Sequence, residues 1–270
     1  MLPRPLHDTA ETALPLAGLE KRLAEKSVLL VGAGGLGSPA AMLLAASGVG
    51  RLGIVDSDVV DRSNLQRQIL HKDWLVGRPK VESARQMLTR LRPDLTVDTH
   101  NLWLNASNIG GIINAYDVVI EGSDNFATKF LVNDACVIAE KPFVIAGILR
   151  FHGQLMTVLP HRSGCYRCLF EAPPPPGEVP GCSEAGVLGV VAGLMGALQA
   201  TEAVKLLLGM GQPLAGRLLT WDALRASFRE VPVPRNPNCA VCGESPTIRE
   251  PRDSELHCEV LAARMGETAT

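Results

Sequence analysis

A glycine-rich turn between an apolar run and a helical segment constrains the fold more than any other feature of this chain. The apolar run 27–31 leads into Gly32–Gly37 (GAGGLG), which has the pattern GxGxxG, and a small-residue helical segment follows at 38–46. A turn in this setting presents backbone N–H groups and the positive end of a helix dipole to phosphate groups. The chain is therefore predicted to bind a nucleotide here, although such a turn can also serve only to pack a strand against a helix.

Strands and helices alternate along the first half of the chain. Hydrophobic residues make up 46% of the sequence and aromatic residues only 4%, so the core must consist of Ala, Val, Leu and Ile, as in parallel sheets. We predict an α/β fold with a Rossmann-like, mostly parallel sheet and helices on both faces. The predicted strands after the glycine turn are 52–56, 96–98, 117–121 and 142–146, and the predicted helices are 80–91 and 125–139.

The pattern changes after Gly147, where antiparallel strands are expected. A strand is predicted at 153–159 and a hairpin from 218–221 and 227–231, with a glycine-rich, nearly uncharged helix at 185–208 between them. Four successive prolines within 171–180 predict an exposed, mobile loop. We divide the chain into an N-terminal arm (1–26), one domain (27–250) with halves at 27–147 and 148–250, and a flexible tail (251–270).

The charge and hydropathy of the chain argue against several classes of function. With 26 basic and 28 acidic residues and a net charge of -2, the protein offers no basic surface for holding nucleic acid. No run is judged long and apolar enough to cross a bilayer, and residues 1–26 lack the order of a secretory signal. We expect a cytoplasmic protein that binds neither nucleic acid nor membrane.

Four of the seven cysteines form two CxxC pairs, Cys165/Cys168 and Cys239/Cys242. In a reducing compartment such pairs favour metal binding over a disulfide framework. Four thiolates from two turns predict a closed, tetrahedral, structural zinc site that staples the C-terminal half of the fold. A redox role for one pair is the alternative, but it leaves the other pair unexplained. Cys136 lies in an apolar helical segment and is predicted to be a core residue.

Polar and charged residues after the second strand indicate which nucleotide is bound. Asp56 ends that strand about 20 residues beyond the glycines, where an acid accepts hydrogen bonds from ribose hydroxyls. NAD and ATP both fit these features. The cluster 64–68 (NLQRQ) and the later Lys80 favour ATP, because cations and amides stabilise the charge of a departing polyphosphate. The alternative for Arg67 and Lys80 is an ordinary solvated charge.

The remaining singled-out residues have simpler interpretations beside the functional ones. Asp124 follows the strand 117–121 at the carboxyl edge of the predicted sheet, where it could hold Mg²⁺ or merely cap the next helix. His71 and His152 are isolated in the sequence and are expected to be solvated or capping residues. Trp74 and Trp103 are predicted to be packing residues.

These features together resemble the ThiF/MoeB/HesA family of adenylyltransferases, which are relatives of the ubiquitin-activating enzymes. The resemblance extends over most of residues 28–242. The segments that carry it are Gly32–Gly37, 56–58 (DSD), 63–68 (SNLQRQ), 77–80 (GRPK), 123–125 (SDN), 165–168 (CYRC), 182–187 (CSEAGV) and 236–242 (NPNCAVC). It implies an enzyme that uses ATP to adenylate the C-terminal glycine of a ubiquitin-like, β-grasp sulfur-carrier protein ending in Gly-Gly, which prepares that carrier for thiocarboxylate formation.

The resemblance also assigns roles to residues. It implies that Asp56 binds the ATP ribose, that Asp124 serves Mg²⁺ and that Cys182 forms a thioester or acyl-disulfide link, with a packing or exposed thiol as the alternative. The implied catalytic residues are Arg67, Lys80, Asp124 and Cys182. The implied nucleotide contacts are Gly34, Gly35, Asp56, Ser63, Asn64, Arg67, Gln68, Lys80, Asp124 and Asn125. No proton has to move when a carboxylate attacks the α-phosphate, so no Ser-His-Asp triad is expected.

The partners implied by the resemblance are a second copy of the chain and a sulfur source. A homodimer is expected, with the region 188–208 at its interface and the half 148–250 binding the carrier. The sequence shows no rhodanese domain, so a separate sulfur donor is expected, either a rhodanese or a cysteine desulfurase, in a pathway such as molybdopterin or thiamin biosynthesis. Residues 1–25 lack the Arg-Tyr-x-Arg-Gln segment of the family. The alternatives are an NAD-dependent oxidoreductase and a non-catalytic, carrier-binding homologue.

Overall fold

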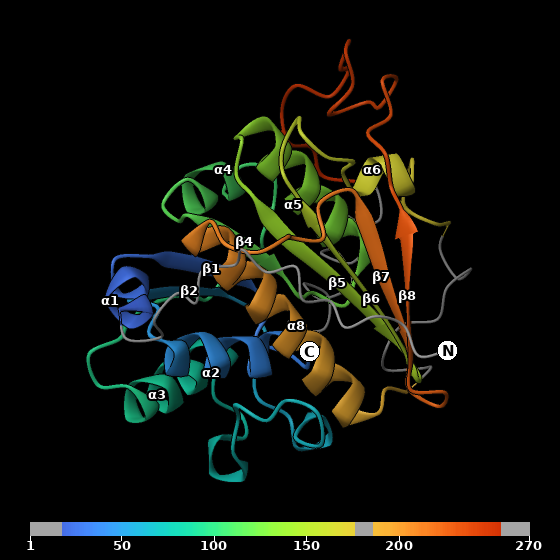
Figure 1. Ribbon diagram of the computed structural model, residues 1–270. Helices are drawn as coiled ribbons and strands as arrows, with labels where there is room; N and C mark the ends of the chain where they lie inside the picture. The colour runs from blue at the N-terminus through green and yellow to red at the C-terminus, as the bar shows by residue number, and fades with distance from the viewer. Residues whose placement is uncertain (1–17, 176–185, 255–270) are drawn as a thin grey trace, which may run out of the picture.

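One sheet of eight strands organises the chain, as the computed structural model shows for residues 18–175 and 186–254 (Figure 1). Most of the predicted arm, part of the proline-containing loop and most of the predicted tail lie outside these described residues. The strands are β1 (Ser27–Val31), β2 (Arg51–Val55), β3 (Thr96–His100), β4 (Val118–Glu121), β5 (Phe143–Leu149), β6 (His152–Val158), β7 (Arg217–Asp222) and β8 (Ser227–Pro232).

The strand order is β3-β2-β1-β4-β5-β6-β7-β8. Strands β1 to β5 pair in parallel, whereas β5 to β8 pair in antiparallel fashion. The chain builds outwards from β1 to β3 and then returns to place β4 on the other side of β1. Ligands in open α/β sheets bind at such a reversal, beyond the carboxyl ends of the strands. The order therefore points to the ends of β1 and β4.

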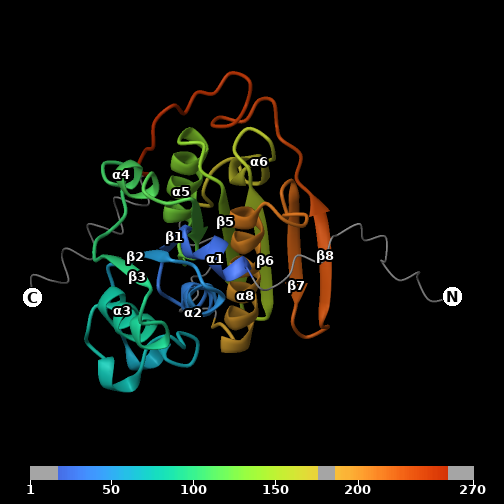
Figure 2. The same cartoon turned by 60° about the vertical axis from the view of Figure 1, so that its left-hand side comes forward.

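Helices cover both faces of the sheet, as predicted (Figures 1 and 2). One face carries α1, α2, α3 and α8, and the other carries α4, α5 and α6. Their bounds are α1 (Leu19–Ala24), α2 (Gly37–Ser47), α3 (Lys80–Leu91), α4 (Ile109–Ile113), α5 (Phe126–Ile138), α6 (Tyr166–Leu169) and α8 (Gly189–Leu208), with short 3₁₀ helices η1 (Arg62–Asn64) and η2 (Asp73–Leu75).

Strand β1 shows why its sequence is apolar throughout. Leu29 and Val31 belong to the core under α4 and α5, whereas Val28 and Leu30 belong to the core under α2, α3 and α8. Each is at most 3% exposed. A strand buried on both faces needs a continuous apolar run, because successive side chains point to opposite faces. The predicted fold class, α/β with a parallel sheet that continues into antiparallel strands, is confirmed.

Helix α8 requires a correction to the hydropathy argument. By length and composition it is long enough and apolar enough to cross a membrane, contrary to the prediction that no such run exists. Half of its apolar window is buried inside the protein, and it packs against α2, β5 and β6. Its apolar composition is thus explained by its place between the sheet and a neighbouring helix, where side chains face apolar surfaces on more than one side.

Candidate nucleotide-binding site and cysteine cluster

The carboxyl ends of β1, β2 and β4 bring three predicted segments to one edge of the sheet. The glycine turn 32–37 follows β1, Asp56 follows β2, and Asp124 lies beyond β4. The turn and the loop after β4 are neighbours, because the Gly122 N–H donates to the Val31 carbonyl at 2.9 Å. A Cβ on Gly32 would lie 3.0 Å from the Gly122 carbonyl oxygen. The residues that the sequence places far apart therefore meet here.

The glycine turn has no room for a side chain at Gly37, and it leaves amides available. A Cβ on Gly37 would lie 1.9 Å from the Gly32 carbonyl oxygen, so only glycine allows α2 to begin where it does. Helix α2 has no side-chain cap at its N-terminus. Among the described residues, none accepts a hydrogen bond from the N–H of Gly34 or Gly35. Uncapped amides at a helix N-terminus form a ready site for an anion.

Asp56 links the glycine turn to the segment that follows β2. Its Oδ2 accepts the Ala33 N–H at 2.8 Å, and its Oδ1 accepts the Asp58 N–H at 2.8 Å. Burial raises the pKa of this carboxyl, an effect opposed by the charge of Lys80 and by the two N–H donors. Each carboxylate oxygen can accept a further hydrogen bond. The predicted ribose contact is therefore compatible with the structural role.

The crossover segment, residues 56–79, carries the amide and arginine cluster. The N-cap of η1 is Asp61, which accepts the Ser63 N–H at 2.7 Å, so the exposed Ser63 forms part of a cap. The Asn64 Oδ1 accepts a hydrogen bond from Arg67 Nη2 at 2.6 Å, which orients the guanidinium. Ser63 and Asn64 thus shape the segment, and their predicted nucleotide contacts remain predictions.

Two side chains of the crossover segment reach the glycine turn. A Cβ on Gly35 would meet the Arg67 Cγ at 3.5 Å, and one on Gly34 would meet the Gln68 Nε2 at 3.6 Å. Gln68 is 5% exposed, and its Oε1 is buried with no hydrogen-bond partner among the described residues. Such an orphaned polar atom is costly unless a ligand or water satisfies it. The turn amides and Arg67 fit the phosphates of a ligand such as ATP, and the Gln68 Oε1 acceptor needs a donor such as a hydroxyl, an amino group or water.

Lys80 is buried and paired, so its interpretation as a solvated charge is wrong. It is the first residue of α3, and its Nζ lies 3.0 Å from the Asp58 Oδ2, with its side chain 7% exposed. The backbone repeats the link, because the Lys80 N–H donates to the Asp58 carbonyl at 2.9 Å. Asp58 was not predicted from the sequence to be a site residue. Its position two residues after the acid Asp56, within the DSD run, was the available signal.

Asp124 is exposed, and it does not cap the helix that follows. Asn125 is the N-cap of α5, since its Oδ1 accepts the Thr128 N–H at 2.8 Å. The capping interpretation of Asp124 is therefore wrong, and its carboxylate stays available to a cation. The side-chain oxygen of Asn125 is already engaged by the helix, so its predicted nucleotide contact would use its amide nitrogen or its backbone.

A buried ion pair holds the loop that carries Asp124. Glu121 at the end of β4 pairs with Lys129 of α5, and it also accepts the Ser123 N–H at 2.8 Å. The Lys129 Nζ donates to the Ala146 carbonyl at 2.7 Å. Burial raises the pKa of the Glu121 carboxyl, and the charge of Lys129 opposes this shift. Because a buried charge without its partner is strongly destabilising, this pair keeps β4, α5 and β5 in one arrangement.

His71 contradicts its interpretation as a solvated or capping residue. It is 3% exposed, and both of its ring nitrogens have partners, Ser83 Oγ at 2.8 Å and the Ala33 carbonyl at 2.8 Å. Burial lowers its pKa to about 4, with a smaller contribution from the charges of Lys80 and Lys72. Nothing in the local sequence marks this burial, because it depends on the crossover segment folding over the glycine turn.

The depressed pKa of His71 predicts a pH dependence of stability. Between the ordinary pKa of about 6.5 and the folded value, the unfolded chain binds a proton that the folded chain does not. The contribution of His71 to the free energy of unfolding is thus complete above about pH 6.5. It is lost as the pH falls towards 4, by about 3 kcal/mol in total. Denaturant unfolding of the wild type and of His71→Gln from pH 7 to pH 4 measures it: the variant should show the smaller loss. An equal dependence of the free energy of unfolding on pH in the two proteins would contradict the prediction.

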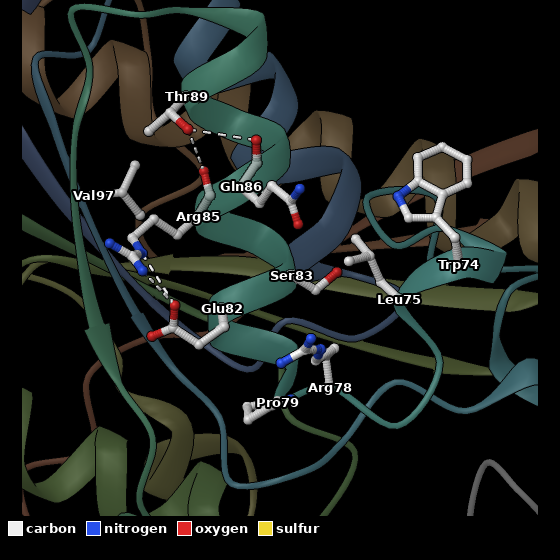
Figure 3. Close-up of a pocket in the computed structure, with 10 residues that line it drawn as sticks. All are labelled: Trp74, Leu75, Arg78, Pro79, Glu82, Ser83, Arg85, Gln86, Thr89 and Val97. Atoms are coloured by element: carbon white, nitrogen blue, oxygen red, sulfur yellow. Dashed lines mark hydrogen bonds and ion pairs between the residues drawn. The ribbon is translucent and has the colours of Figure 1, made fainter.

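A separate hollow of about 730 Å³ lies along the outer side of α3 (Figure 3). Its lining includes the Glu82–Arg85 ion pair and Trp74, which is 67% exposed. Trp74 is thus not the packing residue that was predicted. Of the predicted nucleotide contacts, none lines this hollow. The residues predicted to contact the nucleotide therefore lie at the edge of the sheet and not in this hollow.

The four CxxC cysteines form one cluster, although the two pairs lie far apart in the sequence. Their Sγ atoms all lie within 4.8 Å of one another, with contacts of 3.9 Å (Cys165–Cys168), 3.6 Å (Cys165–Cys239) and 3.4 Å (Cys168–Cys242). A tetrahedron with Zn–S bonds of about 2.3 Å has edges of about 3.8 Å. The Asn236 N–H donates to the Cys168 Sγ at 3.3 Å, as in the outer shell of a thiolate site. The cluster could hold a tetrahedral metal ion.

The cysteine cluster is anchored to α5 by the two residues between the cysteines of its first CxxC motif. Arg167 forms a bidentate ion pair with the buried Asp134, at 2.7 and 2.8 Å. The Tyr166 N–H donates to the Asn133 Oδ1 at 2.8 Å. Helix α5 therefore contacts the cluster through α6 and presents Asp124 just before its first turn. Of the other cysteines, Cys136 is a core residue as predicted, and Cys182 lies outside the described residues.

The fold and the edge site define a nucleotide-binding α/β protein with a cysteine cluster. The chain belongs to the ThiF family, whose model matches residues 10–241. It is similar in fold to the crystal structure of E. coli MccB with AMPCPP and MccA, with a TM-score of 0.74 at 23% identity, covering 84% of this chain and 69% of that one.

Proteins of known activity are similar over most of the chain. The sulfur carrier protein adenylyltransferase of Thermus thermophilus is 49% identical over 252 residues, 91% of this chain and 93% of that protein. The adenylyltransferase and sulfurtransferase MOCS3 of Anopheles gambiae is 46% identical over 243 residues, and the chain spans about half of it, 55%. The prediction of an adenylyltransferase is confirmed by these relatives.

Proposed function

We propose that this protein uses ATP to adenylate the C-terminal glycine of a ubiquitin-like sulfur-carrier protein. The observation that carries this proposal is the 49% identity to a sulfur carrier protein adenylyltransferase over 93% of that enzyme's length. The edge site adds chemical support, since it combines unpaired turn amides with the side chains of Arg67, Gln68 and Lys80. An NAD-dependent oxidoreductase has no use for that combination of cations.

The chemistry requires orientation and charge stabilisation more than proton transfer. A carboxylate of the carrier attacks the α-phosphate of ATP, forms an acyl adenylate and releases pyrophosphate. Amides of Gly34 and Gly35 would contact the phosphates, and Arg67 and Lys80 would stabilise the charge of the departing pyrophosphate. Asp124 would hold Mg²⁺, which neutralises phosphate charge when bound. Asp56 would accept hydrogen bonds from the ribose.

Carrier-dependent exchange of pyrophosphate into ATP tests the proposed function. The purified protein is mixed with ATP, labelled pyrophosphate and a β-grasp carrier that ends in Gly-Gly. Label should enter ATP only when the carrier is present, and a carrier that lacks the two terminal glycines is the matched control. No exchange with any such carrier would reject the adenylation and favour a non-catalytic, carrier-binding homologue.

The metal of the cysteine cluster is proposed to be zinc with a structural role. Four thiolates leave no open position for a substrate, and Zn²⁺ prefers four soft ligands in tetrahedral geometry. The cluster joins α6 to the segment after β8. Zinc there would hold these two segments of the C-terminal half together, without taking part in the adenylation step.

Cys182 is proposed to act after adenylation, as the acceptor of the activated carrier. If its thiolate attacks the acyl adenylate, a thioester forms and AMP leaves. We therefore expect Cys182→Ala to keep wild-type pyrophosphate exchange and to lose the covalent link with the carrier, which mass spectrometry of the intact proteins would detect. Cys136→Ala is the control cysteine variant. A variant that still supports formation of the thiocarboxylate at the wild-type rate would contradict the role.

The remaining partners follow from the same proposal. We propose a homodimer, a cytoplasmic location, and a separate sulfur donor, a rhodanese or a cysteine desulfurase, whose persulfide attacks the thioester carbonyl and releases the Cys182 thiolate. The region 188–208 is proposed to contribute to the dimer interface through residues at the start of α8, where Leu188 and Val190 are 48% and 68% exposed. Sedimentation of the purified protein measures the oligomeric state.

A further inference from the structure

His71 joins three segments that the proposed site needs in register. Its Nε2 lies 2.8 Å from the Ala33 carbonyl oxygen in the glycine turn, and its Nδ1 lies 2.8 Å from Ser83 Oγ, one turn beyond Lys80 in α3. Its own backbone belongs to the crossover segment, where its N–H donates to the Gln68 carbonyl at 3.0 Å. In Figure 3, Ser83 points from α3 towards η2, within the same segment.

The partners of the ring fix its tautomer. A backbone carbonyl can only accept a hydrogen bond, so Nε2 must carry the proton and donate to Ala33. Neutral Nδ1 then accepts the proton of the Ser83 hydroxyl, which can donate. Lys80 and Lys72 are the charged groups that act on the imidazole, and both disfavour a second proton on the ring, as does its burial. The buried imidazole is thus a neutral, directed donor.

The bond to Ala33 determines where the next amide points. The carbonyl of Ala33 and the N–H of Gly34 belong to one planar trans peptide unit, so they point in opposite directions. When His71 holds the carbonyl on its own side, the Gly34 N–H must face the other side. The preceding peptide is held independently, because Asp56 accepts the Ala33 N–H at 2.8 Å. Ser38 Oγ also donates to the Ala33 carbonyl, at the longer distance of 3.2 Å.

We propose that His71 is a positioning residue for ATP, which acts by holding the Ala33–Gly34 peptide so that its N–H, and not its carbonyl, faces the polyphosphate. This inference rests on the proposed function. A flipped peptide would remove one donor from the phosphates and aim a carbonyl oxygen at them, which is unfavourable in a site that binds an anion. No group of His71 needs to touch the substrate.

Two amide replacements separate this role from simple packing. The amide nitrogen of glutamine can occupy the position of Nε2, whereas that of asparagine can occupy only the position of Nδ1. His71→Gln should therefore keep the bond to Ala33, and His71→Asn should lose it. We expect His71→Asn to raise the Kd and KM for ATP by at least about tenfold, with a smaller change in kcat, and His71→Gln to stay within about threefold of the wild type.

Ser83→Ala is the matched control, because it removes the other partner of the ring and leaves the bond to Ala33. It should bind ATP as the wild type does. Each protein is measured at a temperature the same number of degrees below its own melting temperature. Equal ATP affinities for the asparagine and glutamine variants would overturn the inference. A wild type that binds ATP poorly itself would overturn the proposed function, and this inference with it.

A measurement on the wild type tests the role of His71 without any substitution. Nitrogen NMR of histidine-labelled protein should show a neutral ring with its proton on Nε2, unchanged from about pH 8 down to about pH 5. Addition of ATP with Mg²⁺ should shift the amide signal of Gly34 while the ring stays in the same tautomer. A ring with its proton on Nδ1 would overturn the proposal.

Discussion

Replacing Lys80 with glutamine is expected to lower the rate of carrier-dependent pyrophosphate exchange by about two to three orders of magnitude, the usual cost of removing one fixed donor from a developing anion. The Lys80 ammonium is buried and lies 3.0 Å from the Asp58 carboxylate. A charge that is already desolvated interacts strongly with a bound polyphosphate. The side chain therefore has little reorganisation to undergo when ATP binds.

Asp58→Asn is the control that separates phosphate contact from stability. Both variants break the same ion pair, but only Lys80→Gln removes the positive charge from the site. We expect the fold-reduction in activity of Asp58→Asn to be less than about a tenth of that of Lys80→Gln, while the melting temperatures of the two variants fall by similar amounts. A fall in kcat of the same size in both variants would show that the ion pair, and not the contact with ATP, limits the reaction.

Loss of one thiolate from the cysteine cluster is expected to give the largest effect on stability. Cys168→Ser should release the zinc that we propose for the cluster and cost several kcal/mol, since the binding free energy of a structural zinc ion contributes directly to folding. For a domain of this size that corresponds to a fall in Tm of roughly 10 °C or more. Elemental analysis and thermal unfolding of the purified proteins provide the measurements.

Cys136→Ala serves as the control for the cluster variant. Cys136 is fully buried in α5 and is not one of the four clustered thiols, so its replacement should leave the metal content at the wild-type value. A chelator should lower the Tm of the wild type to that of Cys168→Ser and should leave Cys168→Ser unchanged. A wild type that contains no metal, or a variant that keeps it, would refute the assignment.

The elements with strong periodicity could be predicted from the sequence, and those set by tertiary contacts could not. The run 27–31 and the helix 80–91 were found because burial on two faces or on one face leaves a distinct pattern in the residues. Helix α4 (Ile109–Ile113) was missed, because five residues with two glycines carry no helical period. The four clustered cysteines were found because CxxC spacing alone defines a thiolate pair.

The residues of the candidate site could be predicted from the sequence, but the contacts that hold them in place could not. Asp124 was expected to be either a metal ligand or a helix cap, and only the structure assigns the cap to Asn125. His71 and Trp74 were interpreted in the wrong sense, since His71 is buried and Trp74 is exposed. Both lie in the crossover segment, whose path over the glycine turn depends on contacts with residues far away in sequence.

Strand β5 has a mechanical consequence for how the protein can work. It pairs in parallel with β4 and in antiparallel fashion with β6, so a single strand is shared by the nucleotide-binding side and the side that carries the cysteine cluster. Bending between the two sides would break main-chain hydrogen bonds along that shared strand, and therefore clamshell closure is not available to this enzyme. Any change in access to the adenylate must come from loops and side chains that move relative to the rigid sheet.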